Sequence, residues 1–273
     1  MKVSVIVTTY NRPDALAAVL HALAAQTDHD FEVRVADDGS GPQTRGLVQQ
    51  IASTFPVPLS HVWQEDLGFR AGAARNRACA QAQGEYLVFL DGDCVPLPDF
   101  VAQHRALADA RWFVAGNRIL LSPGFTALAL GTGRPLHAQS TLYWLWARLR
   151  GHINRLSPLL RLGNAGWRKV APLRWQGART CNLAVWREDF VAVNGFDEAY
   201  AGWGHEDADL AVRLIRYGAR RKDGSFATAV LHLWHRENDR SREQDNAQRL
   251  AHILQSTHTR ASLGVDQYLT PRA

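Results

Sequence analysis

Cysteine is scarce in this sequence, whose 273 residues include only three: Cys79, Cys94 and Cys181. Cysteines so few and so scattered do not make a disulfide framework, which favours a reducing compartment. No stretch reaches the roughly 18 uninterrupted apolar residues that a transmembrane helix needs. The first residues, MKVSVIVTTYNR, have too short an apolar run for a signal peptide and lack its cleavage site. We therefore predict a cytoplasmic protein without a membrane-spanning helix.

Acidic residues are absent from one long window. Residues 110–187 contain no Asp or Glu but twelve Lys or Arg, while the whole chain has a formal net charge of +5. The rest of the chain is therefore net negative. A segment with such a large excess of positive charge is expected to contact an anionic partner. Nucleic acid, anionic lipid and a phosphorylated acceptor are the alternatives that composition leaves open.

Strand-like and helix-like segments alternate in the first third of the chain. The runs KVSVIVTT, FEVRVADDGS and EYLVFL are typical of buried strands, and an apolar stripe that includes Leu16, Leu20 and Leu23 has helical spacing. This βαβα alternation predicts an α/β fold with a mostly parallel, doubly wound sheet. The alternation stops in residues 122–176, where leucines, aromatics and arginines mix. It returns in the last third, which predicts further helices and the strand ATAVLHLWH.

Polar side chains follow three of the expected strands, at residues 8–12, 37–40 and 91–93. Ligands bind open α/β sheets at the carboxyl ends of the strands, so these groups are expected to share a site. The pair Asp91 and Asp93 repel each other unless a cation or donor compensates them. Hard divalent cations take such oxygen ligands, and Gly92 would let a diphosphate approach. The alternative, here and for Asp37-Asp38-Gly39, is an ordinary acidic turn.

Two further segments carry candidate chemistry. In GWGHEDADLAVRL, Glu206 and Asp207 fall in the first turn of an expected helix, where the helix dipole favours acids. One of them could instead act as a general base near an acceptor hydroxyl. In LHLWH, His232 and His235 are three residues apart, and such residues face opposite sides of a strand. We therefore expect at most one of these histidines to point into the site.

Seven motifs in order resemble a family-two glycosyltransferase of the GT-A fold, over roughly residues 2–235. They are VSVIVTTYNR, VADDGS, DLGFRAGAARNRA, GEYLVFLDGD, NGFDE, GWGHEDADLAVRL and VLHLWH. The C-terminal part is similar to the galactosyltransferase-type half of bacterial chondroitin polymerases and β-1,4-galactosyltransferases. The resemblance implies one GT-A domain with a Rossmann-like nucleotide-sugar-binding half (1–98) that ends in the DxD motif. An acceptor-binding and catalytic half (99–240), with a basic aromatic insertion at 122–176, and a C-terminal helix and tail (241–273) would follow.

The resemblance also assigns residues to the donor site. Those implied to bind the nucleotide sugar are Thr8, Tyr10, Arg12, Asp37, Asp38, Arg75, Asp91 and Gly92. Asp38 would bind the base, expected to be uracil, with Asp37 beside it. Arg75 would support the diphosphate, and Asp91 would lie near the ribose.

Metal and catalytic roles follow from the same resemblance. Asp93 and His235 would bind Mn²⁺ or Mg²⁺, with His232 as the reserve ligand. Asp207 would be the catalytic base, with Glu206 binding a sugar. The implied acceptor-binding residues are Trp203, Gly204 and His205. His205 stands where many relatives have glycine, which leaves the donor preference open.

The implied activity is a metal-dependent, inverting glycosyltransferase. It would move a hexose or N-acetylhexosamine from a nucleotide sugar, expected to be a UDP-sugar, to a hydroxyl of a glycan or a lipid-linked anionic acceptor. Bacterial surface polysaccharide or lipopolysaccharide synthesis is the expected setting. A non-catalytic relative that binds a sugar nucleotide or a polyanion is the alternative. Nucleic acid is not an expected partner, because acids cluster at three strand ends.

The basic aromatic insertion suggests a peripheral contact with the anionic inner face of the cell membrane. An amphipathic helix is expected around Leu142 and Leu145, and Tyr143, Trp144, Trp146 and Trp167 would lie at the headgroup interface. The alternative is a solvated basic surface whose aromatic residues pack in a local core.

Overall fold

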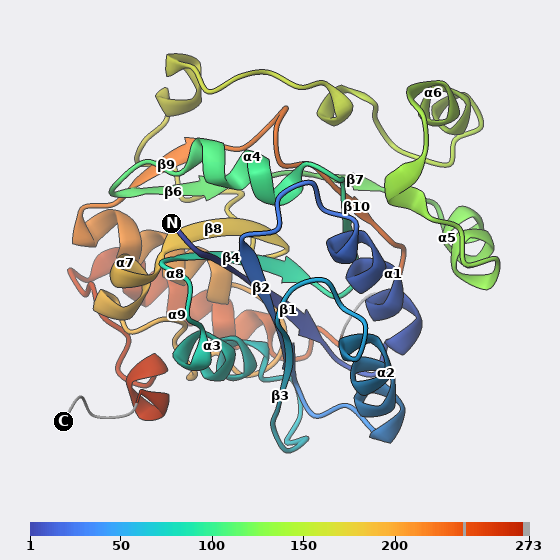
Figure 1. Ribbon diagram of the computed structural model, residues 1–273. Helices are drawn as coiled ribbons and strands as arrows, with labels where there is room; N and C mark the ends of the chain where they lie inside the picture. The colour runs from blue at the N-terminus through green and yellow to red at the C-terminus, as the bar shows by residue number, and fades with distance from the viewer. Residues whose placement is uncertain (237–238, 270–273) are drawn as a thin grey trace.

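The computed structural model describes residues 1–236 and 239–269 (Figure 1). Residues 237–238 and 270–273, which fall in the predicted acceptor half and C-terminal tail, lie outside the described residues. The strands are β1 (Val3–Thr9), β2 (Phe31–Asp37), β3 (Leu59–Trp63), β4 (Tyr86–Asp91), β5 (Cys94–Pro96), β6 (Trp112–Ala115), β7 (Arg118–Leu120), β8 (Asn182–Trp186), β9 (Arg220–Asp223) and β10 (Val230–His232). Within the described residues, seven of them form one sheet in the order β3-β2-β1-β4-β8-β6-β9.

The large sheet is mostly parallel. The pairs β3–β2, β2–β1 and β1–β4 are parallel, as is β6–β9. Strand β8 runs antiparallel to both of its neighbours, β4 and β6. A small second sheet joins β5, β10 and β7, in which β10 is antiparallel to β5 and parallel to β7. The predicted α/β fold with a mostly parallel sheet is confirmed.

Helices cover both faces of the large sheet (Figure 1). They are α1 (Pro13–Ala24), α2 (Pro42–Ala52), α3 (Ala71–Gln81), α4 (Phe100–Leu107), α5 (Pro123–Gly131), α6 (Thr141–Leu149), α7 (Arg187–Ala192), α8 (Glu206–Tyr217) and α9 (Glu243–Gln255). Short 3-10 turns are η1 (Leu136–Ala138), η2 (Ser157–Leu159), η3 (Gly166–Lys169) and η4 (Val265–Tyr268). Helices α1 and α2 lie on one face, and α3, α7 and α8 lie on the other.

Side chains of the central strands alternate between two cores. Along β4, Val88 and Leu90 pack in the core that also holds Leu16 of α1, whereas Leu87 and Phe89 pack in the core of α3, α7 and α8. Successive side chains of a strand point to opposite faces, so a strand that is apolar throughout fits a sheet covered on both faces. This burial fixes the register and brings the carboxyl ends of β1, β2 and β4 to the same edge of the sheet.

The basic aromatic insertion is an irregular segment that carries α5 and α6 at the end of the molecule near α1 (Figure 1). The predicted amphipathic helix is α6. Trp144 is buried in the core with Phe125 and Leu136, so the expectation that it lies at a headgroup interface is wrong. Trp144 is 3% exposed, whereas Trp146 and Trp167 are exposed. No helix in the part of the chain that the structure describes is long and apolar enough to cross a membrane.

Candidate active site

A cavity of about 770 Å³ opens at the carboxyl ends of β1, β2 and β4. It is lined by residues that the sequence analysis assigned to one site: Thr8, Tyr10, Arg12, Asp38, Arg75, Asp91, Gly92, Asp93, Trp203, Gly204, His205, Glu206, Asp207 and His235. Two other predicted site residues, Asp37 and His232, are not among the described residues that line it. The structure therefore brings together residues that lie up to about 230 positions apart in the sequence. This is expected at the carboxyl ends of parallel strands, which meet at one edge of the sheet.

The Asp91-Gly92-Asp93 turn closes tightly against β1. Asp91 is the register partner of Thr8, and the Gly92 N–H donates to the Thr8 carbonyl at 2.7 Å. A Cβ atom at Gly92 would lie only 2.9 Å from the Thr8 carbonyl oxygen. Glycine is required here because the backbone passes too close to β1 for a side chain. The turn therefore places both aspartates at the cavity.

Arg75 of α3 connects the acids of the cavity. Its Nη2 donates to Asp91 at 3.0 Å, its Nε donates to Thr8 Oγ1 at 2.9 Å, and its Nη1 lies 3.5 Å from Glu206. Burial alone would lower the pKa of Arg75, but the charges of Asp91, Asp207 and Glu206 raise it. A buried guanidinium in this position partly neutralises three carboxylates that would otherwise repel one another.

The two acids at the end of β2 have different surroundings. Asp38 faces the cavity, where it accepts from the Arg70 N–H at 2.7 Å and from Gln64 Nε2 at 2.6 Å. Burial raises the pKa of Asp38 to about 6. Asp37 instead accepts from the Ser40 N–H at 2.8 Å and lies 2.7 Å from His61 Nε2. Asp37 is not among the described residues that line the cavity, because its carboxylate holds the turn through these contacts, and its assignment to the nucleotide site stays a prediction.

Both candidate histidines approach Asp93. Nε2 of His235 lies 3.5 Å from Asp93 Oδ2, and Nε2 of His232 lies 3.8 Å from Asp93 Oδ1. Among the described residues, His235 lines the cavity and His232 does not, in agreement with the expectation that at most one of them points into the site. Both can approach Asp93 because β10 ends at His232 and His235 lies in irregular backbone, where side chains do not alternate. Burial, and then the charge of Asp91, raises the pKa of Asp93 to about 6. Two carboxylates and an imidazole that lie close together are ligands that fit Mn²⁺ or Mg²⁺.

Glu206 and Asp207 begin α8 and face the cavity. Asp207 Oδ1 accepts from the Thr180 hydroxyl at 2.6 Å. Burial, and then the charge of Asp207, raises the pKa of Glu206 to about 7, and burial also raises the pKa of Asp207. His205, immediately before the helix, has a left-handed backbone with φ of +73°. This turn directs the first carboxylates of α8 towards Arg75.

The structure also adds residues that the sequence analysis did not assign to the site. They include Arg118, Arg179, Thr180, Cys181, Arg240 and Glu243. Thr180 and Cys181 directly precede β8, whose first residues lie at the carboxyl end of β4 because the two strands are antiparallel. The run CNLAVW could have indicated these residues. An apolar strand next to polar residues predicts that this end of the strand lies at a site.

Comparisons with known proteins agree on the family. Residues 4–155 match glycosyl transferase family 2, and residues 167–236 match the N-terminal domain of galactosyltransferase. Validoxylamine A glucosyltransferase of Streptomyces hygroscopicus subsp. jinggangensis is 32% identical, with coverage of 79% of this chain and 51% of the relative. Hyaluronan synthase of Pasteurella multocida is 31% identical over 82% of this chain and 24% of the relative. The chain thus spans about half or less of the length of these relatives.

Solved structures agree on the fold. A mannosyltransferase from Pyrobaculum calidifontis, in complex with GDP-Man and Mn²⁺, matches with a TM-score of 0.62 and 21% identity over 93% of this chain and 64% of its own. TarS from S. aureus matches with a TM-score of 0.57 and 18% identity over 98% of this chain and 68% of its own. The chain has the GT-A fold, and more than half of its length matches one family. The chain therefore belongs to glycosyl transferase family 2.

Proposed function

We propose that the chain is a metal-dependent, inverting glycosyltransferase. It transfers a hexose or N-acetylhexosamine from a UDP-sugar to a hydroxyl of a glycan or lipid-linked anionic acceptor, in bacterial surface polysaccharide or lipopolysaccharide synthesis. The observation that carries this proposal is the meeting of Asp91 and Asp93 with Asp207 in one cavity. Curated relatives named hyaluronan synthase and chondroitin synthase, and TarS structures with UDP and UDP-GlcNAc, support the substrate class.

Residues 1–98 form the donor half in this proposal. Asp38 accepts a hydrogen bond from the base, and Thr8, Tyr10 and Arg12 line the nucleotide pocket. Asp93 and His235 would hold the divalent cation, with His232 as the reserve ligand. The cation supplies positive charge against the diphosphate leaving group. Arg75 orients Asp91 by its hydrogen bond of 3.0 Å and keeps this carboxylate near the ribose.

Residues 99–240 bind the acceptor and supply the base. The acceptor hydroxyl gives its proton to Asp207 as its oxygen attacks the anomeric carbon, and the bond from that carbon to the diphosphate breaks on the opposite side. A direct displacement of this kind inverts the anomeric centre. Thr180 orients Asp207 through the 2.6 Å hydrogen bond, and Glu206 binds a sugar hydroxyl. Trp203, Gly204 and His205 border the acceptor space, where an indole gives an apolar face for a sugar ring.

A panel of nucleotide sugars, assayed with and without Mn²⁺, tests the proposal. We expect selective, metal-dependent turnover that is lost in Asp93→Ala and falls about 10²–10⁴-fold in Asp207→Asn, because a general base contributes about that much. Asp266→Asn is the matched control, since Asp266 forms an ion pair with Arg260 away from the cavity. Turnover that is the same with and without Mn²⁺, and the same in Asp93→Ala as in the wild type, would overturn the metal-assisted mechanism. Donor binding with no turnover in the wild type would instead support the non-catalytic relative.

We also propose that α6 contacts the anionic inner face of the cell membrane. Leu142, Leu145, Trp146 and Leu149 form one exposed face of α6, and Leu142 and Leu149 are 78% and 79% exposed. Arg148 and Arg150 lie on and just after the same helix, in a window without acids. An exposed apolar face flanked by cations matches an anionic bilayer, whose surface attracts Arg and whose acyl boundary takes up Leu and Trp.

Vesicle flotation tests this membrane contact. We expect binding to phosphatidylglycerol vesicles at low salt, weaker binding to phosphatidylcholine vesicles, and loss of binding in the double variant Leu142→Ser/Leu149→Ser. Leu254→Ser is the matched control, because Leu254 is 42% exposed on α9, outside the basic window. No flotation of the wild type with anionic vesicles would refute the membrane contact while leaving the transferase proposal intact.

A further inference from the structure

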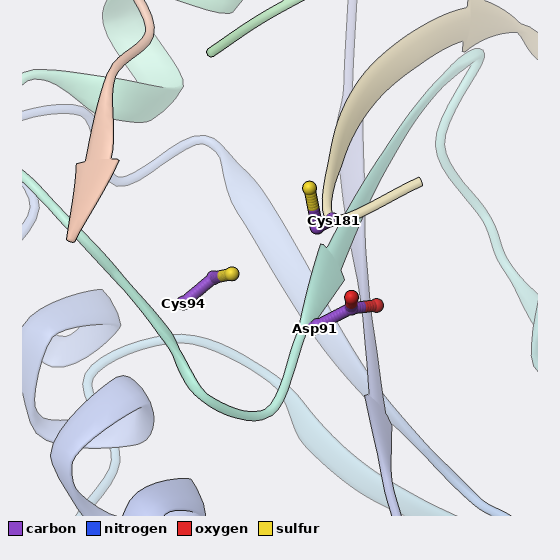
Figure 2. Close-up of side chains that lie close together, drawn as sticks. All are labelled: Asp91, Cys94 and Cys181. Carbon is purple, nitrogen blue, oxygen red and sulfur yellow. The ribbon is translucent and has the colours of Figure 1, made fainter. Parts of the chain in front are cut away.

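Two buried cysteines meet beside the Asp91-Gly92-Asp93 turn, and the proposed reaction uses neither of them. Cys94 follows Asp93 directly and begins β5, whereas Cys181 directly precedes β8. Figure 2 shows the Cys94 sulfur directed towards the end of β4, where Asp91 and Cys181 lie. The two sulfur atoms and a carboxylate oxygen of Asp91 all lie within 4.8 Å of one another. Segments that are 87 positions apart in the sequence therefore place two thiols and one carboxylate at a single point.

A second set of donors shares Cys94. Its sulfur, a carboxylate oxygen of Asp93 and a ring nitrogen of His232 also lie within 4.8 Å of one another. Cys94 Sγ is 3.6 Å from Asp93 Oδ1. The sulfur of Cys94 thus lies between two groups of metal-binding side chains.

The chemistry of these donors differs from that of the proposed Mn²⁺ or Mg²⁺ site. Thiolates are soft ligands that select Zn²⁺ and similar ions, whereas Mg²⁺ and Mn²⁺ favour carboxylate oxygen and water. Two sulfur ligands of a tetrahedral Zn²⁺, each about 2.3 Å from the ion, lie roughly 3.8 Å apart. The spacing of Cys94, Cys181 and Asp91 is close enough for one ion to bind all three with small side-chain rotations.

We propose that Cys94, Cys181 and Asp91 form a binding site for a thiophilic divalent cation such as Zn²⁺, and that its occupation inhibits the transferase. Each thiol loses its proton to solvent as its sulfur binds the ion. Two thiolates and one carboxylate exceed the charge of the ion, and Arg118 Nη1, 3.9 Å from Cys181 Sγ, offsets the excess. His232 can complete the coordination from the side of Asp93.

Inhibition, which rests on the proposed function, follows from the position of the site. Binding of Zn²⁺ would draw Asp91 away from Arg75, with which it is paired at 3.0 Å. It would also shift Cys94 and so the adjacent Asp93, the proposed Mn²⁺ ligand. Because divalent-ion affinity generally rises from Mn²⁺ to Zn²⁺, Zn²⁺ is expected to act at concentrations well below those of activating Mn²⁺.

Titration with Co²⁺, a spectroscopic substitute for Zn²⁺, tests the site independently of activity. The full chain, kept reduced with a phosphine, should develop thiolate-to-cobalt charge-transfer absorption that Zn²⁺ displaces. Cys94→Ser and Cys181→Ser should each lose most of this absorption. Cys79→Ser is the matched control, because Cys79 is the other buried thiol, lies on α3 and belongs to neither donor set. Absorption that is missing in the wild type, or that survives in Cys94→Ser/Cys181→Ser, would overturn the proposal.

Two further measurements test the thiolate site without relying on the folding of the cysteine variants, and separate it from the proposed transferase activity. Zn²⁺ should slow alkylation of Cys181 in the wild-type protein, measured by mass spectrometry, which needs no variant to fold. No protection of Cys181 at a Zn²⁺ concentration that displaces Co²⁺ would count against the site. Asp93→Ala should lose Mn²⁺-dependent turnover and keep the cobalt absorption. A chain that shows the absorption but no turnover with any donor would overturn the proposed function and leave the thiolate site standing.

Discussion

His205 combines a strained backbone with a place in the cavity wall. Its φ of +73° lies in the left-handed region, which costs a residue with a Cβ roughly 1–2 kcal/mol. Glycine adopts that conformation without the penalty. The imidazole is therefore retained at a cost to stability, which points to a role in the cavity.

We expect His205→Gly to raise the free energy of unfolding by about 1 kcal/mol, because it removes that strain. Urea denaturation measures the change. Ala208→Gly, in the first turns of α8, is the control and should have the opposite sign, since glycine weakens a helix. A His205→Gly protein that is clearly less stable than the wild type would show that the side chain contributes more than the left-handed turn costs.

Asp38 gives a prediction about pH. Its pKa is raised from 3.8 to about 6 by burial, so the folded state favours the neutral carboxyl. The stability that Asp38 contributes is therefore full below about pH 4 and is lost as the pH rises through about 6. The wild type should lose stability relative to Asp38→Asn over this range, measured by urea denaturation at several pH values. A difference between the wild type and Asp38→Asn that stays flat over this range would contradict the raised pKa of Asp38.

Motifs in the sequence identified most of the cavity, and they failed where side-chain direction decides the outcome. Asp37 and Asp38 are adjacent, and successive side chains of an extended chain point to opposite sides, so only one of them can face the cavity. The motif alone does not say which. For His232 and His235 the expectation that at most one faces the cavity held, since among the described residues only His235 lines it. The approach of both to Asp93 was not predicted, because the strand ends between them and the alternation stops.

At the scale of the element, α6 has two faces with different roles. Trp144 is 3% exposed and packs in the core with α5, whereas Trp146 is 42% exposed on the face that we propose meets the membrane. We expect Trp144→Ala to lower the free energy of unfolding by about 3–5 kcal/mol, as is usual for a buried Trp. Trp146→Ala should change it little and should weaken vesicle flotation. Equal destabilisation by both variants would mean that Trp146 is also buried in solution.

Strand β8 is one of the elements that the sequence analysis did not identify, and it bears on the site. Its residues are apolar and short, and they lie after a segment whose composition predicts no regular structure. This run has no turn residues that would show the direction of the strand. The direction of β8 is what places Thr180 and Cys181 at the edge of the sheet where the cavity opens. By contrast, β1, β2 and β4 could be predicted because each is followed by a helix or a polar turn at a typical distance.

At the scale of the whole molecule, the basic window is partly neutralised by acids outside it. Arg161 pairs with Asp99, and Lys169 with Asp109, in both cases with an acid from before the window. Arg168 is buried and donates to backbone carbonyls, including those of Asp223 and Ser225. The sequence shows the excess of cations but not these pairings, because they depend on where the irregular segment lies against the sheet.

The same segment should also be the less protected part of the molecule. Strands β1 and β4 are buried on both faces, whereas residues 150–176 have little regular structure and many exposed side chains. Amide hydrogen exchange should therefore be slowest in β1 and β4 and much faster in residues 150–176, because local opening there breaks few buried contacts. Comparable protection in both regions would indicate that the segment is covered in solution, for example by a second copy of the chain.

The antiparallel placement of β8 has a consequence for biosynthesis. As the chain leaves the ribosome, β1 to β4 emerge first, but one edge of β4 stays without its partner until about ninety further residues have been made. An apolar strand with an open edge is prone to pair with other chains, so the nascent protein passes through a state that favours aggregation. A fragment ending near residue 98 should therefore be poorly soluble, although it carries most of the proposed nucleotide pocket.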